Sequence, residues 1–424
     1  MLASLAVETT RDIRAFIVSQ GEELLCGLTI DTNASFLAEQ LTGLGMRVVG
    51  MVTAGDQVDV IANALRDAVA RAQVVVCTGG LGPTGDDLTA DAVARAFDLE
   101  LVLDEEAMSQ VEQRYASLGR PMPHSNQRQA TIPEGAQVVP NPLGTAPGFH
   151  LELHDKVHLW FLPGVPSEMK VMWAETVAPS LTATLSPEAP LRRVFRVMGQ
   201  GESALQDLLG DLPERFPDVA LGFRARMPEN HVKLVAGPTH AEQLHDAARV
   251  VRERLGKNCF SEQEGLHLTG VVGALLTARG ERLALAESCT GGLLGHLCVS
   301  EAGSSAWLDR GFITYSNEAK LEHLGVSPQV LEEHGAVSEA TVLAMAEGAA
   351  KAATAQWGLA VTGIAGPTGG SPEKPVGTVW LGVSGVSGQR ARRLQLGRDR
   401  NSNRQWAAWS ALDMLRRQLL RAGQ

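Results

Sequence analysis

The chain has 424 residues, and its 48 acidic and 37 basic side chains give a formal net charge of −11. With 44% hydrophobic and 20% charged residues, the composition excludes a mainly disordered, collagen-like or coiled-coil protein. The acidic balance argues against a general nucleic-acid binder, which needs a basic face. At about 100–200 residues per domain, the length predicts two to four domains.

Other features of the composition indicate where the protein works. No apolar run reaches the roughly 20 residues that a membrane span requires, so we expect no membrane partner. The leading residues include Glu8 and Asp12 and lack the apolar core of a secretory signal. Five scattered cysteines fit neither a zinc site nor a disulfide framework and are typical of a reducing compartment. We therefore expect a cytoplasmic protein.

The first part of the chain alternates between short apolar runs and segments with apolar residues at helical spacing. The runs predict strands at 15–19, 47–52, 74–78 and 158–162, and the spaced segments predict helices at 33–44 and 58–72. Strands separated by helices predict an α/β fold with a parallel sheet covered on both faces. Ligands of such sheets bind at the carboxyl ends of the strands.

Two boundaries divide the rest of the chain. Prolines near residues 186–190 end the first pattern, and residues 191–261 then combine strand and helix patterns as a compact α+β unit. A polar stretch at 256–265 forms the second boundary. A further α/β domain follows, with a helix at 266–278 and strands at 283–286, 311–315, 359–362 and 378–383. We therefore predict three domains, at 1–186, 187–261 and 262–424.

A glycine-rich loop, TGGLGPTGDDLT (residues 78–89), directly follows an apolar strand. Its glycines let a ligand approach the backbone, whose N–H groups can bind a phosphate: Gly79, Gly80, Gly82 and Gly85. Asp86 and Asp87 then precede a helix, either as metal ligands or as charges that the helix dipole favours. The density of glycines favours the first alternative, which is typical of magnesium-assisted phosphoryl chemistry.

Further polar segments follow predicted strands. They are GEELLCGLTIDTN (21–33), Asp56, NPLGTAPGF (141–149) and LPGVPSEMK (162–170), the last of which contains Glu168. Each alone is ordinary turn chemistry, but together they surround one edge of the sheet. With the glycine-rich loop, this set resembles the N-terminal domain of the CinA family (competence/damage-inducible protein A). That domain is similar to the molybdopterin-binding domain of molybdenum-cofactor biosynthesis proteins.

The resemblance implies an activity and a set of residues for the first domain. The family hydrolyses ADP-ribose to AMP and ribose 5-phosphate with a divalent metal, whose identity the sequence leaves open. The implied substrate-binding residues are Gly79, Gly80, Gly82 and Thr89. The candidate metal ligands are Asp56, Asp86, Asp87 and Glu168.

A second strand–loop–helix pattern, ALAESCTGGLLG, spans residues 284–295. Ser288 stands where the strand ends and the helix begins. The N–H groups and the helix dipole there can stabilise an oxyanion or bind a phosphate, or Ser288 is only an N-cap hydroxyl. Cys289 has no nearby histidine to activate it, and we interpret it as a small buried residue.

Residues that can activate a nucleophile follow in GSSAW (303–307) and GFITYSNEAK (311–320). A Ser–Lys or Tyr–Lys pair requires that Lys320 be desolvated; otherwise it is a solvated helix residue. The segment TGIAGPTGG (362–370) leaves its backbone open to a ligand. The arginines of GRDRNSNR (397–404) form either a phosphate clamp or a solvated turn.

These segments together are similar to the C-terminal CinA domain, which also occurs alone as nicotinamide-nucleotide amidase. The match covers nearly all of residues 262–415. It implies hydrolysis of nicotinamide mononucleotide to nicotinate mononucleotide and ammonia, with no cofactor. The implied catalytic residues are Ser288, Ser305, Tyr315, Lys320 and Thr362, with either serine as the nucleophile. The implied substrate-binding residues are Gly291, Gly292, Gly366 and Arg400.

The middle unit resembles the KH-like linker domain of the same family, but it lacks the GXXG clamp of RNA-binding KH domains, so we interpret it as structural. The sequence thus predicts a bifunctional hydrolase of pyridine-nucleotide salvage. Its predicted substrates are nicotinamide mononucleotide and ADP-ribose, and we expect a homodimer or larger homo-oligomer without a nucleic-acid partner. The alternatives are a non-catalytic partner of competence or DNA-repair proteins, or a molybdopterin-binding protein.

Overall fold

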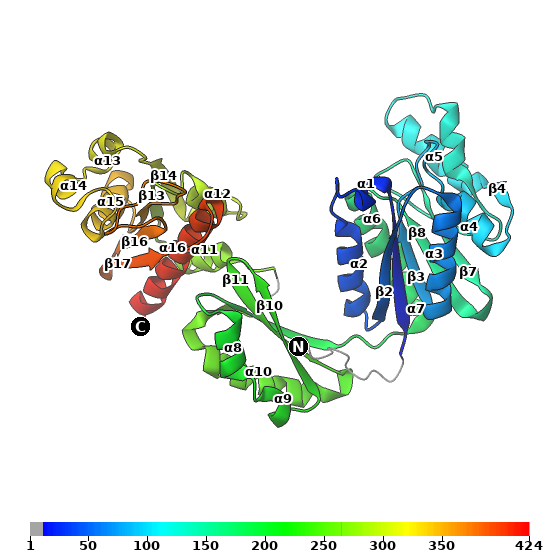
Figure 1. Ribbon diagram of the computed structural model, residues 1–424, viewed down its shortest axis with the longest axis horizontal. Coiled ribbons are helices and arrows are strands. Elements are labelled where there is room, and N and C mark those ends of the chain that lie inside the picture. The colour runs from blue at the N-terminus through cyan, green and yellow to red at the C-terminus, as the bar shows by residue number, and fades with distance from the viewer. Residues whose placement is uncertain (1–11, 264, 424) are drawn as a thin grey trace.

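A computed structural model describes residues 12–263 and 265–423 of the chain. Residues 1–11, where the sequence predicts no signal peptide, lie outside the described part. Figure 1 shows an N-terminal lobe and a C-terminal lobe, each built around a sheet, with a smaller lobe between them. Within the described ranges, no helix combines the length and the apolar character needed to cross a bilayer.

The N-terminal lobe contains a six-stranded sheet in the order β2-β1-β3-β8-β7-β6. The strands are β1 (Arg14–Gln20), β2 (Arg47–Ala54), β3 (Val74–Thr78), β6 (Gln137–Val139), β7 (Gly148–Leu153) and β8 (Val157–Leu162). Strands β2, β1, β3 and β8 are parallel, as predicted, but β7 and β6 are antiparallel to their neighbours. The difference arises because only a short connection joins β7 to β8, and a parallel crossover needs a dozen or more residues.

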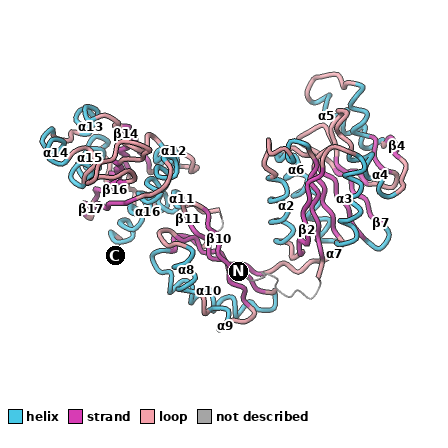
Figure 2. Tube along the Cα trace, viewed as in Figure 1, coloured by secondary structure: helices cyan, strands magenta, loops and turns pink. Residues whose placement is uncertain are grey.

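Helices cover both faces of this sheet (Figures 1 and 2). Helices α2 (Thr32–Gly43), α6 (Pro166–Met172) and α7 (Ala178–Leu185) pack on one face, and α3 (Val58–Arg71) and α4 (Thr89–Phe97) pack on the other. The remaining elements are α1 (Glu22–Leu25), α5 (Glu105–Ser117), the π-helical turn Trp173–Val177 that joins α6 to α7, the 3-10 helices His124–Ala130 and His154–Lys156, and the strand pair β4 (Leu101–Leu103) and β5 (Thr131–Pro133). Strand β3 is buried along its whole length because both faces are covered.

The middle lobe is an antiparallel sheet in the order β10-β11-β9-β12, with helices packed against it. Its elements are β9 (Leu191–Val197), α8 (Glu202–Leu209), α9 (Leu212–Arg215), β10 (Val219–Arg226), β11 (Glu229–Ala236), the 3-10 helix Pro238–His240, α10 (Ala241–Leu255), the 3-10 helix Gly256–Asn258 and β12 (Cys259–Ser261). The lobe has its own hydrophobic core, as expected for a compact α+β unit.

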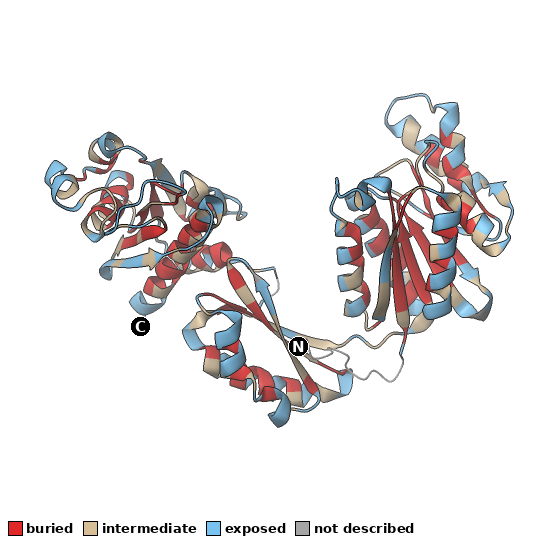
Figure 3. Ribbon diagram, in the orientation of Figure 1, coloured by how far each residue is buried: buried red, intermediate tan, exposed pale blue. Residues whose placement is uncertain are grey.

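The C-terminal lobe is a five-stranded sheet in the order β14-β13-β15-β16-β17. Its strands are β13 (Leu283–Glu287), β14 (Leu308–Ile313), β15 (Trp357–Gly363), β16 (Thr378–Gly385) and β17 (Gly388–Gln395). The first three strands in that order are parallel, and β16 and β17 are antiparallel. Figure 3 shows the buried residues concentrated along the sheet and on the helix faces that cover it.

Helices also cover both faces of the C-terminal sheet. Helices α11 (Leu268–Thr277), α12 (Leu293–Val299) and α16 (Arg400–Ala422) form one layer, and α13 (Asn317–Leu324), α14 (Pro328–His334) and α15 (Glu339–Ala353) form the other. A 3-10 helix, Ser304–Ala306, precedes β14. The carboxyl ends of the three parallel strands therefore lie together at one edge, where the sequence predicts a ligand site.

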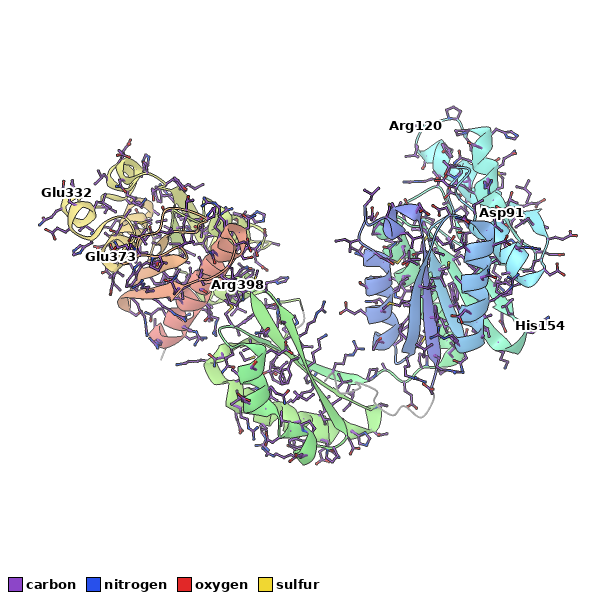
Figure 4. The ribbon with its side chains drawn as sticks, in the orientation of Figure 1. Asp91, Arg120, His154, Glu332, Glu373 and Arg398 are labelled. Atoms are coloured by element: carbon purple, nitrogen blue, oxygen red, sulfur yellow. The ribbon has the colours of Figure 1, made fainter. Side chains whose placement is uncertain are left out.

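The middle and C-terminal lobes pack against each other. Met227, at the tip of the β10–β11 hairpin, has its sulfur 2.9 Å from Trp406 Nε1 and 3.4 Å from Arg398 Nη1. Figure 4 labels Arg398 where this hairpin reaches the C-terminal lobe. Met198 and Phe260 of the middle lobe belong to the same hydrophobic cluster as the core of the C-terminal lobe.

Candidate functional site

The C-terminal lobe has a cavity of about 270 Å³ at the carboxyl ends of β13 and β15. Six residues that the sequence predicts as catalytic or substrate-binding line it: Ser288, Tyr315, Lys320, Thr362, Gly366 and Arg400. Cys289 also lines it. These residues come from segments up to 112 positions apart in the chain, between Ser288 and Arg400. The fold therefore gathers most of the predicted amidase residues around one cavity.

Ser288 and Lys320 are in contact at this cavity. Ser288 follows the last residue of β13, and its N–H donates to the Val361 carbonyl of the neighbouring strand at 2.9 Å. Lys320 is carried by α13, which starts where the Ser316 side chain accepts the Ala319 N–H at 3.1 Å. Lys320 Nζ lies 3.3 Å from Ser288 Oγ. Ser288 is 8% exposed and Lys320 only 1% exposed, so water has little access to the pair.

Three backbone carbonyls surround the Lys320 amine. They belong to Thr314 at 2.8 Å, Tyr315 at 3.2 Å and Ser316 at 3.2 Å from Nζ. Burial lowers the pKa of Lys320 because the charged form loses its hydration. In the structure Nζ donates to Ser288 Oγ; once deprotonated, the amine can donate two hydrogen bonds to the carbonyls and has a lone pair for the Ser288 hydroxyl proton. The site can therefore hold a Ser–Lys pair in which the amine acts as the base.

Strand β14 lies three residues earlier than the sequence predicts at its start and two residues earlier at its end. Thr314 and Tyr315 therefore follow the strand instead of ending it, and their carbonyls are free to turn toward Lys320. The Tyr315 side chain is 64% exposed at the rim of the cavity. The Thr362 hydroxyl is buried and donates to the Ala336 carbonyl at 2.8 Å.

The structure corrects the prediction for Ser305. This residue lies in the exposed 3-10 helix before β14 and does not line the cavity. The Trp307 carbonyl next to it pairs with the N–H of Leu283, which starts β13, whereas Ser288 follows the end of β13. With about 3.3 Å per residue, the two ends of this strand are separated by about 13 Å. Ser305 is therefore at the wrong end of the sheet, and Ser288 is the candidate nucleophile.

Gly291 and Gly292 also differ from the prediction that they bind substrate. The Gly291 N–H donates to the Ser288 carbonyl at 3.1 Å, and the Gly292 N–H donates to Glu287 Oε2 at 2.9 Å. Neither glycine lines the cavity. Because both N–H groups already have partners within the loop, these residues shape the loop and leave a substrate phosphate to other groups.

Arg400 is a second cationic residue that lines the cavity. It is the first residue of α16, and its Nη1 donates to the Gly366 carbonyl at 2.7 Å. Asp399 caps the same helix, accepting the N–H groups of Asn401 and Ser402 at 3.0 Å each. Arg404, one turn later, instead donates to the Thr290 carbonyl. The predicted arginine cluster therefore divides into one cavity residue and others with structural contacts.

The N-terminal lobe has a second cavity, of about 290 Å³, beside the glycine-rich loop. Among the predicted residues, Gly80, Gly82 and Asp87 line it. Apolar residues also line it: Leu81, Leu101, Ile132, Pro147 and Phe149. A cavity lined by apolar side chains together with a few polar groups is a common form of ligand site.

Gly79 and Thr89, which the sequence also predicts as substrate-binding, hold the loop in place. The Gly79 N–H donates to the Leu162 carbonyl of β8 at 3.0 Å. The Thr89 hydroxyl is buried, 2.8 Å from both the Gly79 carbonyl and Gln20 Oε1. Gly80 has a φ of +64°, a conformation that favours glycine, and this turn directs the loop along the cavity.

The four predicted metal ligands do not form a common site. Asp87 Oδ2 accepts the Thr84 N–H at 2.9 Å and its hydroxyl at 2.5 Å. The others lie outside the cavity lining, where Glu168 accepts from Asn141, Asp56 accepts from the Glu22 N–H, and Asp86 is exposed. Across residues 12–263 and 265–423, no three His, Cys, Asp or Glu side chains group as metal ligands. Of the four candidates, Asp87 is therefore the carboxylate that lines the cavity, and its role as a metal ligand stays a prediction.

Sequence reasoning missed Arg128 at the N-terminal cavity. It lies in the 3-10 helix His124–Ala130, with its Nη2 2.6 Å from Asp91 Oδ2 and its Nε 3.1 Å from the Asp87 carbonyl. Asp91, labelled in Figure 4, projects from α4. Of the described residues that line this cavity, Arg128 is the one with a cationic side chain. No local motif marks it, because it reaches the loop from 41 positions away.

With this geometry established, the chain can be compared with known proteins. Residues 266–419 match the family model of the CinA C-terminal domain, residues 192–261 the damage-inducible protein CinA KH domain, and residues 16–183 a probable molybdopterin binding domain. A CinA-like protein of Citrifermentans bemidjiense is 44% identical over 410 residues, covering 96% of this chain and 98% of that protein. The chain belongs to the CinA family.

The chain is also similar to a second CinA-like protein and to a solved structure. A CinA-like protein of Desulfosudis oleivorans is 42% identical over 414 residues, covering 96% of this chain and all of that protein. A solved structure described as competence/damage inducible protein CihA from Agrobacterium tumefaciens is 42% identical over 37% of this chain and 94% of its own, with a TM-score of 0.35. The predicted order of a molybdopterin-binding-like domain, a KH-like domain and a CinA C-terminal domain is confirmed.

Proposed function

We propose that the C-terminal lobe of this CinA-family protein hydrolyses the amide of nicotinamide mononucleotide to nicotinate mononucleotide and ammonia. The observation that carries the proposal is the 3.3 Å contact between Lys320 Nζ and Ser288 Oγ at the cavity. An amide is a poor electrophile, so its hydrolysis requires a nucleophile and a base held together. The buried pair meets this requirement without a metal ion.

The reaction follows from the arrangement of the pair. The neutral Lys320 amine takes the Ser288 hydroxyl proton as Oγ attacks the amide carbon. The C–N bond then breaks, the Lys320 ammonium returns a proton to the leaving nitrogen, and ammonia departs. Water, deprotonated by the same amine, hydrolyses the resulting ester and frees Ser288. Every step uses groups of this chain and water.

The groups around the pair support a nucleotide as the substrate. Arg400 provides a cation for the phosphate in the same cavity, and the Gly366 carbonyl accepts a hydrogen bond from its guanidinium. The exposed Tyr315 ring at the rim offers a flat surface for the pyridinium ring. The substrate would thus lie with its amide toward Ser288 and its phosphate toward Arg400.

For the N-terminal lobe we propose hydrolysis of ADP-ribose to AMP and ribose 5-phosphate. The glycine-rich loop, the Arg128 guanidinium and the apolar residues that line the 290 Å³ cavity suit a diphosphate that carries a planar base. Asp87 would provide a ligand for a divalent cation, with phosphate oxygens and water completing the shell, as is usual for magnesium. The cation would supply polarisation of the phosphoryl oxygens.

Molybdopterin binding is a second candidate for the N-terminal lobe, favoured by the match of residues 16–183 to a probable molybdopterin binding domain. It uses the same cavity and assigns no role to the Ser288–Lys320 pair. A non-catalytic role in competence or DNA repair uses neither cavity. We further propose that the protein works in the cytoplasm. We also propose that it forms a homodimer or larger homo-oligomer, and light scattering of the purified protein would test this oligomeric state.

One assay separates these candidates. Purified protein is incubated in parallel with nicotinamide mononucleotide and with ADP-ribose, and ammonia, nicotinate mononucleotide and AMP are measured. We expect ammonia and nicotinate mononucleotide in equal amounts from the first substrate, and AMP from the second when Mg²⁺ or another divalent cation is present. Release of neither set of products at high enzyme concentration would favour the binding or partner roles.

A further inference from the structure

A buried carboxylate stands directly before the candidate nucleophile. Glu287 is the last residue of β13 and is 2% exposed. Its Oε2 accepts the N–H groups of Gly292 at 2.9 Å and Leu294 at 3.0 Å, and its Oε1 accepts the N–H of Gly295 at 2.8 Å. No salt bridge to Glu287 occurs in the part of the chain that the structure describes. Backbone amides therefore solvate this carboxylate.

These hydrogen bonds close the loop that carries Ser288. Residues 288–292 connect the end of β13 to α12, and Glu287 ties the start of this loop to its far end. A charge-assisted bond to a carboxylate is about twice as strong as a neutral one, so three of them hold the loop firmly. The side chain also occupies the N–H groups at the start of α12, which explains why that helix offers no anion site to the substrate.

A second path links Glu287 to the base. The Glu287 backbone carbonyl accepts the Thr314 N–H at 2.8 Å. The carbonyl of that same Thr314 accepts a hydrogen bond from Lys320 Nζ at 2.8 Å. Glu287 is therefore linked to both residues of the pair: its side chain holds the loop that carries Ser288, and its backbone carbonyl holds Thr314, whose own carbonyl binds Lys320.

We propose that Glu287 is a positioning residue that fixes Ser288 Oγ relative to Lys320 Nζ. The inference rests on the proposed amidase function, although serine reactivity also tests it without that substrate. Replacing the carboxylate by an amide keeps the size and one acceptor oxygen but places an NH2 group against a backbone N–H donor. The loop must then shift to relieve this donor–donor contact, and a shift of about 1 Å near reacting atoms costs about 10²-fold in rate.

The test compares Glu287→Gln with Glu281→Gln. Glu281 lies near the amino end of the same strand, where its Oε2 accepts the Nε1–H of the buried Trp357 at 2.6 Å. Both variants exchange a well-bonded carboxylate for an amide, but only Glu287 is beside Ser288. The measurements are kcat and KM with nicotinamide mononucleotide, the melting temperature, and the rate at which a fluorophosphonate probe labels Ser288 in the full-length protein.

We expect Glu287→Gln to lower both kcat and the labelling rate about tenfold to a hundredfold, with KM changed less than about twofold. Glu281→Gln should lower the melting temperature and leave kcat and labelling unchanged. Glu287→Asp keeps the charge with a shorter reach; we expect it to fold and lose kcat, and it decides the matter if the amide variant does not fold.

Wild-type kcat and labelling in the folded Glu287 variants would overturn the proposal. The proposal would also be overturned if the Glu281 and Glu287 variants lost kcat in the same proportion to their loss of melting temperature. If the wild-type protein labels at Ser288 but does not hydrolyse nicotinamide mononucleotide, the proposed function fails separately. In that case slower labelling of Glu287→Gln still supports the positioning role.

Discussion

The two cavities differ in whether their reactive side chains are already in contact with one another. In the C-terminal lobe, Ser288 and Lys320 are in contact, and three carbonyls hold the Lys320 amine, whose side chain is buried. In the N-terminal lobe, the carboxylates bond to neighbouring N–H and hydroxyl groups and do not converge. A site that reacts through its own side chains must have them in contact before the substrate binds. A site that uses a metal ion can be completed when the cation and the substrate phosphates bind.

Replacing Ser288 should produce the largest effect. Ser288→Ala removes the nucleophile, and we expect the amidase kcat to fall about 10⁴-fold or more, with ADP-ribose hydrolysis unchanged. Ser305→Ala, at the other end of the sheet, is the matched control and should keep wild-type kinetics. Ammonia release from nicotinamide mononucleotide measures both. An active Ser288→Ala variant would contradict the assignment of Ser288, and not Ser305, as the nucleophile.

Lys320 should have the next largest effect. Lys320→Met keeps an unbranched side chain in the buried site and removes the base, so we expect kcat to fall about 10²–10⁴-fold while KM changes little. In the wild type, the base works when it is neutral, so activity should rise with pH through a pKa that lies below the ordinary 10.5. A raised KM with nearly unchanged kcat would instead make Lys320 a substrate-binding residue.

Metal removal should separate the two lobes. EDTA should abolish AMP formation and leave ammonia release unchanged, because the Ser–Lys pair needs no metal. The structure also ranks the two neighbouring carboxylates. Asp87→Asn, at the cavity, should lower ADP-ribose hydrolysis about tenfold to a hundredfold, and Asp86→Asn, which does not line the cavity, should have a much smaller effect. Loss of both activities in EDTA would contradict this division.

Arg400 should affect binding more than chemistry. Its guanidinium lines the cavity but does not touch Ser288 or Lys320, so Arg400→Ala should raise KM for nicotinamide mononucleotide about tenfold and change kcat less than about threefold. Nicotinamide riboside, which lacks the phosphate, provides the control substrate. The variant should hydrolyse it as the wild type does. Equal loss with both substrates would remove the phosphate role from Arg400.

A smaller effect concerns the stability of the N-terminal lobe. His150 on β7 lies 3.3 Å from His158 and stacks on Trp160, and burial followed by the neighbouring His158 lowers its pKa from 6.5 to about 4. Because the unfolded chain binds this proton more readily, stability should fall as pH drops from about 6.5 to 4, by about 3 kcal/mol.

Denaturant titration at several pH values measures this loss. His150→Phe should show a flatter pH dependence than the wild type. His154→Gln, which replaces the exposed histidine labelled in Figure 4, should retain the wild-type slope. Identical slopes in the wild type and His150→Phe would exclude His150 as the source.

Apolar patterning predicted most of the fold because buried parallel strands need continuous apolar runs. β3 has the predicted limits, and the predicted strand at 283–286 lies within β13. The sequence does not predict strand β17, because it is an edge strand in which Arg390, Arg392 and Arg393 are exposed. Charged side chains on an edge strand prevent further pairing but remove the apolar signal.

Site residues that lie at the end of a strand could be predicted from the sequence. Site residues that belong to a segment distant in sequence could not. Ser288 follows β13, whereas Ser305 precedes β14, and that difference in order was a usable signal for rejecting Ser305. Glu287 also had a signal, because a carboxylate that ends an all-apolar strand needs a buried partner. Arg128 had none, since its contact with the Asp87 carbonyl depends on how α5 and the following turn pack.

The most direct test of the account is to identify the atom that carries the acyl group during amide hydrolysis. The protein is mixed with nicotinamide mononucleotide, quenched in acid within one turnover, digested and analysed by mass spectrometry. We predict the mass of the nicotinate mononucleotide acyl group on the peptide that contains Ser288, its loss in Ser288→Ala, and its release as a hydroxamate by hydroxylamine. An acyl group on Ser305 or Cys289, or rapid turnover that never acylates the protein, would contradict the central role of the Ser288–Lys320 pair.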